Sequence, residues 1–92
     1  MDAEPPPVTA SGLSGRVRVT LITRPGCHLC DQAREVVLRV ARQTATGVEE
    51  RSILDDPLLA RQYADMVPVV LVDGHQHDYW RVDASRLRAA LG

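Results

Sequence analysis

The sequence predicts an α/β domain with a mixed four-stranded sheet flanked by helices, in the order β-α-β-α-β-β-α. Three observations support this fold class. Alternating or continuous apolar runs indicate strands, apolar residues at helical spacing indicate helices, and an Asp-Gly pair indicates a tight hairpin. A strand–helix–strand unit gives parallel neighbours whereas a hairpin gives antiparallel ones, so we expect the sheet to be mixed.

The first half of the domain is predicted to be a strand, a long helix and a second strand. Residues 16–23 alternate at first and then become more apolar, which is typical of a strand that enters a buried sheet. An Arg-Pro-Gly sequence ends this strand, and a helix from Cys27 should stop before Gly47. Residues 48–54 form the second strand. The apolar positions of the helix are Leu29, Ala33, Val36, Val37, Val40 and Ala41.

The second half is predicted to contain a short helix, a hairpin and a last helix. Residues 55–57 read Asp-Asp-Pro, an acidic cap followed by a proline suited to the first helical turn. Residues 68–72 are the most apolar run of the chain, and Asp73-Gly74 turns it back into an antiparallel strand over residues 75–82. Asp83 caps the last helix. The apolar stripe of that helix is Leu87, Ala90 and Leu91.

Length and composition limit the function classes. The chain has 92 residues, a formal net charge of -1 and no apolar run near the about 18 residues of a membrane span. We therefore expect neither a nucleic-acid nor a membrane partner, and a monomer. Residues 1–15 form an acidic, Pro/Ser/Gly/Thr-rich tail unlike a secretion signal, so residues 16–92 are predicted to form the domain and the location to be cytoplasmic.

Both cysteines of the chain lie in one C-x-x-C motif, Cys27-His28-Leu29-Cys30, at the turn from the first strand into the first helix. In a cytoplasmic protein this context indicates a redox pair. Free N–H groups at the helix N-terminus favour negative charge, and Arg24 and His28 add positive potential, so the thiolate form of Cys27 should be favoured. Cys30 lies nearly one turn further along the helix and should be more buried. We expect Cys27 to be the nucleophile and Cys30 the resolving thiol.

Three other interpretations of the motif are open. A structural disulfide across four residues would contribute only about 2 kcal/mol, against about 5 kcal/mol for a 100-residue loop. C-x-x-C is also half of a zinc site, with His75 and His77 as the other ligands, and it can hold an iron–sulfur cluster shared between chains. The third alternative is a non-catalytic binding domain.

At this point the residues resemble a known family. Residues 23–30, Thr-Arg-Pro-Gly-Cys-His-Leu-Cys, followed by residues 67–70, Val-Pro-Val-Val, resemble the glutaredoxins, and more closely the bacterial glutaredoxin-like C-x-x-C proteins. The similarity spans about residues 16–91. It implies the thioredoxin-like fold and the activity of a thiol–disulfide oxidoreductase.

The resemblance also implies roles for single residues. Arg24 stands where many glutaredoxins have a lysine. Pro68 resembles the family's cis-proline beside the nucleophile, and the backbone of Val67 would pair with a substrate chain in the manner of a strand. Arg61 and Arg81 would bind a carboxylate of a partner or of glutathione, or else lie solvated on the surface.

Two stretches depart from the family pattern. His28-Leu29 stands between the cysteines where typical glutaredoxins have Pro-Tyr or Pro-Phe. Residues 78–83 lack the glycine pair with which glutathione-binding members reach glutathione. Within that stretch, we interpret Tyr79 and Trp80 as core or edge packing residues.

These observations predict a reaction. The Cys27 thiolate attacks the disulfide of a protein or a low-molecular-weight mixed disulfide, and Cys30 then resolves the intermediate. No cofactor is expected to be permanently bound. The external reductant would be glutathione, another low-molecular-weight thiol or a reductase.

Overall fold

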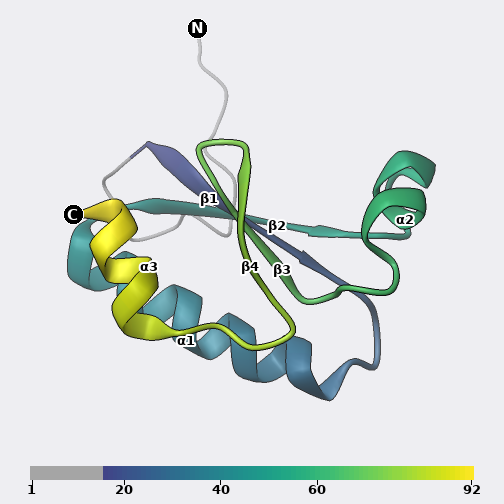
Figure 1. Cartoon of the computed structure of the whole chain (residues 1–92), viewed down its shortest axis with the longest axis horizontal. Helices are drawn as coiled ribbons and strands as arrows, with labels where there is room; N and C mark the ends of the chain where they lie inside the picture. The colour runs from purple at the N-terminus through teal and green to yellow at the C-terminus, as the bar shows by residue number, and fades with distance from the viewer. Residues whose placement is uncertain (1–15) are drawn as a thin grey trace, which may run out of the picture.

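The structure is a computed structural model that describes residues 16–92, so the predicted N-terminal tail lies outside the described residues. The order of elements is the predicted one (Figure 1). The elements are β1 (Val17–Thr23), α1 (His28–Thr44), β2 (Gly47–Ser52), α2 (Pro57–Tyr63), β3 (Val69–Val72), β4 (His75–Tyr79) and α3 (Ala84–Leu91).

The four strands form one mixed sheet in the order β2-β1-β3-β4. β1 and β2 are parallel, as expected when a helix connects two neighbouring strands. β3 is antiparallel both to β1 and to β4, with which it forms the predicted hairpin. In Figure 1, α1 and α3 lie together on one face of the sheet, and α2 lies apart from them. The predicted mixed sheet with helices on both faces is therefore confirmed.

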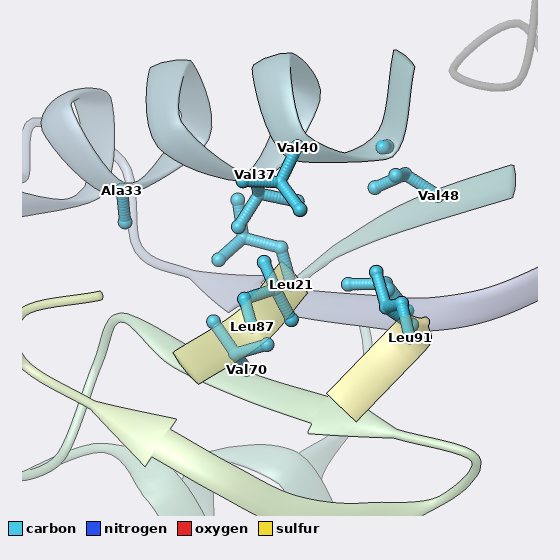
Figure 2. Packing of buried hydrophobic residues seen from close by; sticks show 10 residues of the cluster. Leu21, Ala33, Val37, Val40, Val48, Val70, Leu87 and Leu91 are labelled. Carbon is cyan, nitrogen blue, oxygen red and sulfur yellow. The ribbon is translucent and has the colours of Figure 1, made fainter. Parts of the chain in front are cut away.

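Side chains of β1 and β3 alternate between the two faces and thereby supply two separate cores. Leu21 and Val70 point toward α1 and α3, where Figure 2 shows them against Val37 and Leu87. We call this set the α1–α3 cluster. Its buried members are Val19, Leu21, Ala33, Val37, Val40, Ala41, Val48, Val70, Leu87 and Leu91.

The opposite face of the sheet carries a second group, the α2 cluster. Ile22 directly follows Leu21 in β1, and Val69 directly precedes Val70 in β3. Because neighbouring residues of a strand point to opposite faces, Ile22 and Val69 point to this face. The cluster includes one cysteine. Its buried members are Ile22, Cys30, Ile53, Tyr63, Val67 and Val69. This second core therefore lies against the C-x-x-C motif.

The helices begin where the sequence predicted. The side chain of Asp56 accepts the N–H of Leu58 at the start of α2, and Asp83 accepts the N–H of Arg86 at the start of α3. α1 is the longest helix, with 17 residues, and it ends at Ala45 in a left-handed conformation. No helix within residues 16–92 is long and apolar enough to cross a membrane.

Two predicted strand ends are wrong. β2 ends at Ser52 rather than at residue 54, because the N–H of Asp55 donates to the carbonyl of Ser52 at 2.9 Å and closes a turn there. β4 ends at Tyr79 rather than at residue 82, because Trp80 has a φ of 63° and cannot continue a strand. The N–H of Arg81 donates to the carbonyl of Tyr79 at 2.7 Å, which closes a three-residue γ-turn around Trp80. The strand-like sequence continues to residue 82, but this turn takes the chain out of the sheet.

One residue of the predicted apolar stripe of α3 is not buried. Ala90 is exposed, whereas its neighbours in the stripe, Leu87 and Leu91, are buried. Leu29 and Val36 of α1 are only half-buried, although they share the helical spacing of the buried residues. Val36 packs against the α1–α3 cluster, and both side chains line a surface groove.

Candidate functional site: the cysteine pair and the groove beside it

The site is centred on Cys27, which caps the N-terminus of α1. The residue has an extended conformation, with φ -96° and ψ 113°, and its Sγ accepts the backbone N–H of Cys30 at 3.1 Å. Its carbonyl accepts the N–H of Asp31 at 3.2 Å and so begins the helix. Sulfur thus takes the position in which Ser or Asp oxygens usually cap helices. Cys27 is half-buried and Cys30 is buried, as the sequence predicted.

Cys30 lies one turn into α1, with 1% of its surface exposed. Burial raises the pKa of the Cys30 thiol to about 11, and its hydrogen bond to Cys27 acts in the same direction. The backbone N–H and the positive charge of Arg24 act in the opposite direction. Both cysteines are free thiols in the structure. The pair therefore consists of an accessible sulfur and a buried, protonated one.

The loop before β3 approaches the cysteines from the sheet. The Val67–Pro68 peptide bond is cis, which confirms that expectation from the resemblance. Val67 is buried in the α2 cluster, where Cys30 is a member and Cys27 packs at the edge. Pro68 is fully buried, and its carbonyl accepts the N–H of Trp80 at 2.8 Å. Val67 thus lies in the same cluster as the cysteine pair, and Pro68 follows it directly in the chain.

The four charged or polar candidates around the motif have different positions. Arg24 lies close enough to Cys30 to affect its pKa. His28 is exposed in the first turn of α1. Arg61 is exposed on α2, and Arg81 is exposed between β4 and α3. Their role as ligands of a carboxylate stays a prediction.

The histidines proposed as further metal ligands do not lie with the cysteines. His75 pairs with Val72, and Val72 pairs with Val19 near the start of β1. The C-x-x-C motif follows the other end of β1, so His75 is at the opposite end of the sheet. Among residues 16–92, no three His, Cys, Asp or Glu side chains come together as a set that could hold a metal ion. The four-ligand zinc site considered from the sequence is therefore wrong.

An ion-pair network ties the first turns of α1 to the sheet. Arg34 donates two hydrogen bonds to Glu50 of β2, at 2.8 and 2.7 Å, and one to Asp31 at 2.9 Å. The hydroxyl of the buried Thr23 donates to Glu50 at 3.0 Å. The Arg34 guanidinium lowers the pKa of Glu50, although burial opposes it. Because Asp31 follows Cys30 directly, this network fixes the part of the helix that carries the cysteines.

A groove of about 240 Å³ opens beside the motif. One wall is formed by four residues of α1, namely Leu29, Gln32, Ala33 and Val36. The other wall is the turn before α3, formed by Trp80, Arg81 and Val82. Leu29 stands between the two cysteines in the sequence, and the groove therefore includes one residue of the motif.

Comparison with solved structures identifies the class of fold. A thioredoxin variant from Halobacterium salinarum superposes with a TM-score of 0.58 over 90% of this chain and 76% of that chain, at 23% identity. A protein of X. campestris superposes with a TM-score of 0.65 over 79% of this chain and 93% of that chain, at 38% identity. The protein has the thioredoxin-like fold that the resemblance implied.

The sequence comparisons identify the family. The chain belongs to the glutaredoxin-like domain family (DUF836), whose profile matches residues 18–92. An uncharacterized protein of Mycobacterium tuberculosis is 35% identical over 81 residues, which is 83% of this chain and 84% of the relative. A thioredoxin of Methanocaldococcus jannaschii is 34% identical over 62 residues, 64% of this chain and 73% of that protein.

Sequence reasoning missed the groove and the ion-pair network. The spacing of Asp31 and Arg34 suits a helical ion pair, but their link to Glu50 depends on how β2 packs. Trp80 was interpreted as a packing residue, whereas 52% of its surface is exposed. Its position in the sequence, two residues after Asp78 in a strand-like run, contains no signal for the γ-turn.

Proposed function

We propose that this protein is a thiol–disulfide oxidoreductase that works through Cys27 and Cys30. The observation that carries the proposal is the contact between them: the half-buried Cys27 Sγ caps α1 and accepts the N–H of Cys30, and the Cys30 thiol is buried one turn away. The thiolate is the form of a cysteine that attacks disulfides, and Cys27 Sγ is the accessible sulfur of the pair. Membership of the glutaredoxin-like family supports the same chemistry.

The reaction delivers two electrons from the dithiol to a substrate disulfide. The Cys27 thiolate attacks one substrate sulfur, a mixed disulfide forms, and the other substrate sulfur leaves as a thiolate that takes up a proton. Cys30 then loses its proton and attacks Cys27 Sγ. The second substrate thiolate leaves and is protonated, and the enzyme holds a Cys27–Cys30 disulfide. Two equivalents of an external thiol, or one dithiol reductase, return it to the starting state.

The raised pKa of Cys30 fits the order of these steps. A buried thiol with a pKa of about 11 stays protonated while Cys27 makes the first attack. Once Cys27 is in a mixed disulfide, its negative charge is gone, and this charge was one of the causes of the raised pKa of Cys30. Cys30 therefore becomes easier to deprotonate when its attack is needed.

The groups around the pair would bind the substrate. The backbone of Val67 would pair with the substrate chain as an added strand at the start of β3, and the cis Pro68 would lie beside the reacting sulfurs. Arg24 would supply positive charge beside the pair. The substrate is a protein disulfide or a mixed disulfide, the reductant is glutathione, another small thiol or a reductase, and a reducing cytoplasm is the compartment in which this cycle can turn over.

Two serine variants test the proposal. Cys27→Ser should abolish the reduction of a small aromatic disulfide, because no other cysteine is in a position to attack. Cys30→Ser should stop turnover at a mixed disulfide that mass spectrometry detects as a covalent adduct on Cys27. Unfolding curves of both variants serve as controls for folding.

Two results would contradict the proposed function. If Cys27→Ser reduces the disulfide as fast as the wild type, the pair does not carry the reaction. If the purified chain is coloured by bound iron, or holds colourless zinc that metal analysis detects on its cysteines, a metal centre shared between chains replaces the proposed function.

A further inference from the structure

We propose that the groove beside the cysteine pair binds one large apolar side chain of a protein substrate, of the size of leucine or phenylalanine, located within a few residues of the substrate cysteine and next to an acidic residue. This inference rests on the proposed function and names the class of substrate.

The groove adjoins the C-x-x-C motif through Leu29 and the cis-proline loop through Trp80. Leu29 belongs to the C-x-x-C motif and forms part of the groove wall. Trp80 of the opposite wall donates its backbone N–H to the carbonyl of Pro68 in the cis-proline loop, so both walls are attached to residues around the cysteine pair. Residues near a substrate cysteine bonded to Cys27 can therefore reach the groove, which would contribute to the choice among substrates that the same dithiol attacks.

The surface of the groove is mainly apolar. Val36 and Val82 pack against the α1–α3 cluster and leave their outer sides to the groove. Leu29 and the indole of Trp80 complete an apolar lining from opposite walls. When an apolar side chain enters the groove, both the side chain and the lining lose contact with water. This burial contributes about 25 cal/mol of binding free energy for each Å² of apolar surface.

Trp80 is held in its position by bonds to the cis-proline loop. Its backbone N–H donates to the carbonyl of Pro68 at 2.8 Å, and its indole Nε1–H donates to the carbonyl of Asp65 at 3.2 Å. Tyr79 packs edge-to-face against it, with ring centroids 5.0 Å apart. A φ of 63° is unfavourable for a residue of this size, and such strain is concentrated at binding sites. The half-exposed indole is thus a rigid wall that requires no ordering when a ligand binds.

Size and charge indicate which ligand the groove accepts. A volume of about 240 Å³ holds one large side chain but is smaller than the roughly 300–1,000 Å³ of sites for whole small molecules. Arg81 is the single charged residue of the lining. It can pair with one carboxylate, whereas glutathione carries two carboxylates and an ammonium group. An apolar side chain with one acidic neighbour is the ligand that this lining complements.

The test uses two synthetic peptides of equal length, each with one cysteine as the mixed disulfide of thionitrobenzoate. One peptide has a leucine and a glutamate near the cysteine, and the other has serine in place of the leucine. Release of coloured thionitrobenzoate by the reduced full chain gives a second-order rate constant for each. We expect the leucine peptide to react at least about tenfold faster, as is usual for apolar pockets. Equal rates would overturn the inference.

Two variants locate the preference in the groove. Trp80→Gly removes one wall at a position whose φ glycine adopts freely, and Gln32→Phe fills the groove from the opposite wall. Each should bring the ratio of the two rates close to one. Leu54→Gly and Glu35→Phe make the same kinds of change at exposed positions outside the lining, and both should keep the full ratio. A ratio that survives in both groove variants would contradict the inference.

A non-peptide disulfide separates this inference from the proposed function. Bis(2-hydroxyethyl) disulfide has neither an apolar side chain nor a carboxylate, so its reduction by the wild type requires the cysteine pair but not the groove. If the wild type does not reduce it, the proposed function fails. If the wild type reduces it but does not distinguish the peptides, only the groove inference fails.

Fluorescence gives a second readout that is independent of rates. Trp80 is the only tryptophan of the chain. In the trapped adduct of Cys30→Ser, the leucine peptide should shift the emission of Trp80 to shorter wavelength and the serine peptide should not. The same emission in both adducts would mean that the leucine lies outside the groove.

Discussion

The two cores on opposite faces of the sheet differ in what they contain. The α1–α3 cluster consists of aliphatic side chains only, packed between β1, β3 and two helices (Figure 2). The α2 cluster contains Cys30, Tyr63 and the loop residue Val67, and it is covered by one short helix. Cys27 lies at its edge. One core thus holds the sheet and the long helix together, and the other brings the cysteine pair and the cis-proline loop to the same place.

This difference teaches how a small domain combines stability with a reactive site. A reactive thiol needs access to solvent and a substrate, which a close-packed core excludes. The chain therefore places its aliphatic core under the body of α1 and its chemistry at the N-terminal end of the same helix. Substitutions on the two sides should separate the stability of the fold from the properties of the cysteines.

The largest expected effect is on the reactivity of Cys30. A pKa raised from 9.0 to about 11 reduces its thiolate fraction at pH 8 about hundredfold relative to an ordinary cysteine. Alkylation followed by mass spectrometry should label Cys27 first, and labelling of Cys30 should increase up to about pH 11. Equal labelling of both thiols at pH 8 would show that Cys30 is not held in the buried, protonated state.

Neighbouring residues of β1 provide a matched pair across the two cores. Leu21 and Ile22 are both at most 1% exposed, and they point to opposite faces. Each change to alanine should lower the free energy of unfolding by about 2–5 kcal/mol, measured in urea. Only Ile22→Ala should also accelerate the labelling of Cys30 in the native state, because Ile22 packs in the same cluster. A similar acceleration in Leu21→Ala would contradict the separation of the cores.

A smaller effect is expected from the ion pair that fixes the start of α1. Glu50→Gln should lower the free energy of unfolding at pH 7 by about 1–2 kcal/mol, since it weakens two charge-assisted hydrogen bonds from a half-exposed Arg34. The folded-state pKa of Glu50 is lowered, so its contribution is present above about pH 4.5 and is lost as the pH falls through the folded pKa. Urea unfolding at several pH values should show the difference between wild type and variant shrinking in acid. A constant difference would mean that ionised Glu50 is not responsible.

The smallest effect is expected at the helix caps of the two faces. Asp83→Ala and Asp56→Ala each remove a side-chain oxygen that accepts an N–H at the start of α3 or α2, at a cost of about 1 kcal/mol. Both should lower the unfolding midpoint. Only Asp56→Ala, on the face of the α2 cluster, should change the rate of Cys30 labelling. If Asp83→Ala changes that rate to the same extent, α3 also supports the cysteine pair.

The sequence was sufficient for the elements that depend on local signals. Residues close together in the sequence determine the helix caps, the Asp73-Gly74 hairpin and the C-x-x-C motif. The structure contains these features where the sequence predicted them. The end of β4 was not predictable in this way, because a hydrogen bond to the distant Pro68 and a γ-turn end it at Trp80. The groove and the link from Arg34 to Glu50 depend likewise on contacts between elements far apart in the chain.

The most direct test of the proposed chemistry is a redox titration of the full chain in buffers of defined potential, with thiol labelling of Cys27 and Cys30 read by mass spectrometry. We predict one reversible two-electron transition between the dithiol and the intramolecular disulfide, at a potential between roughly −180 and −270 mV. If the two thiols form no reversible disulfide, or if a bound metal blocks them, the protein is not the oxidoreductase proposed here.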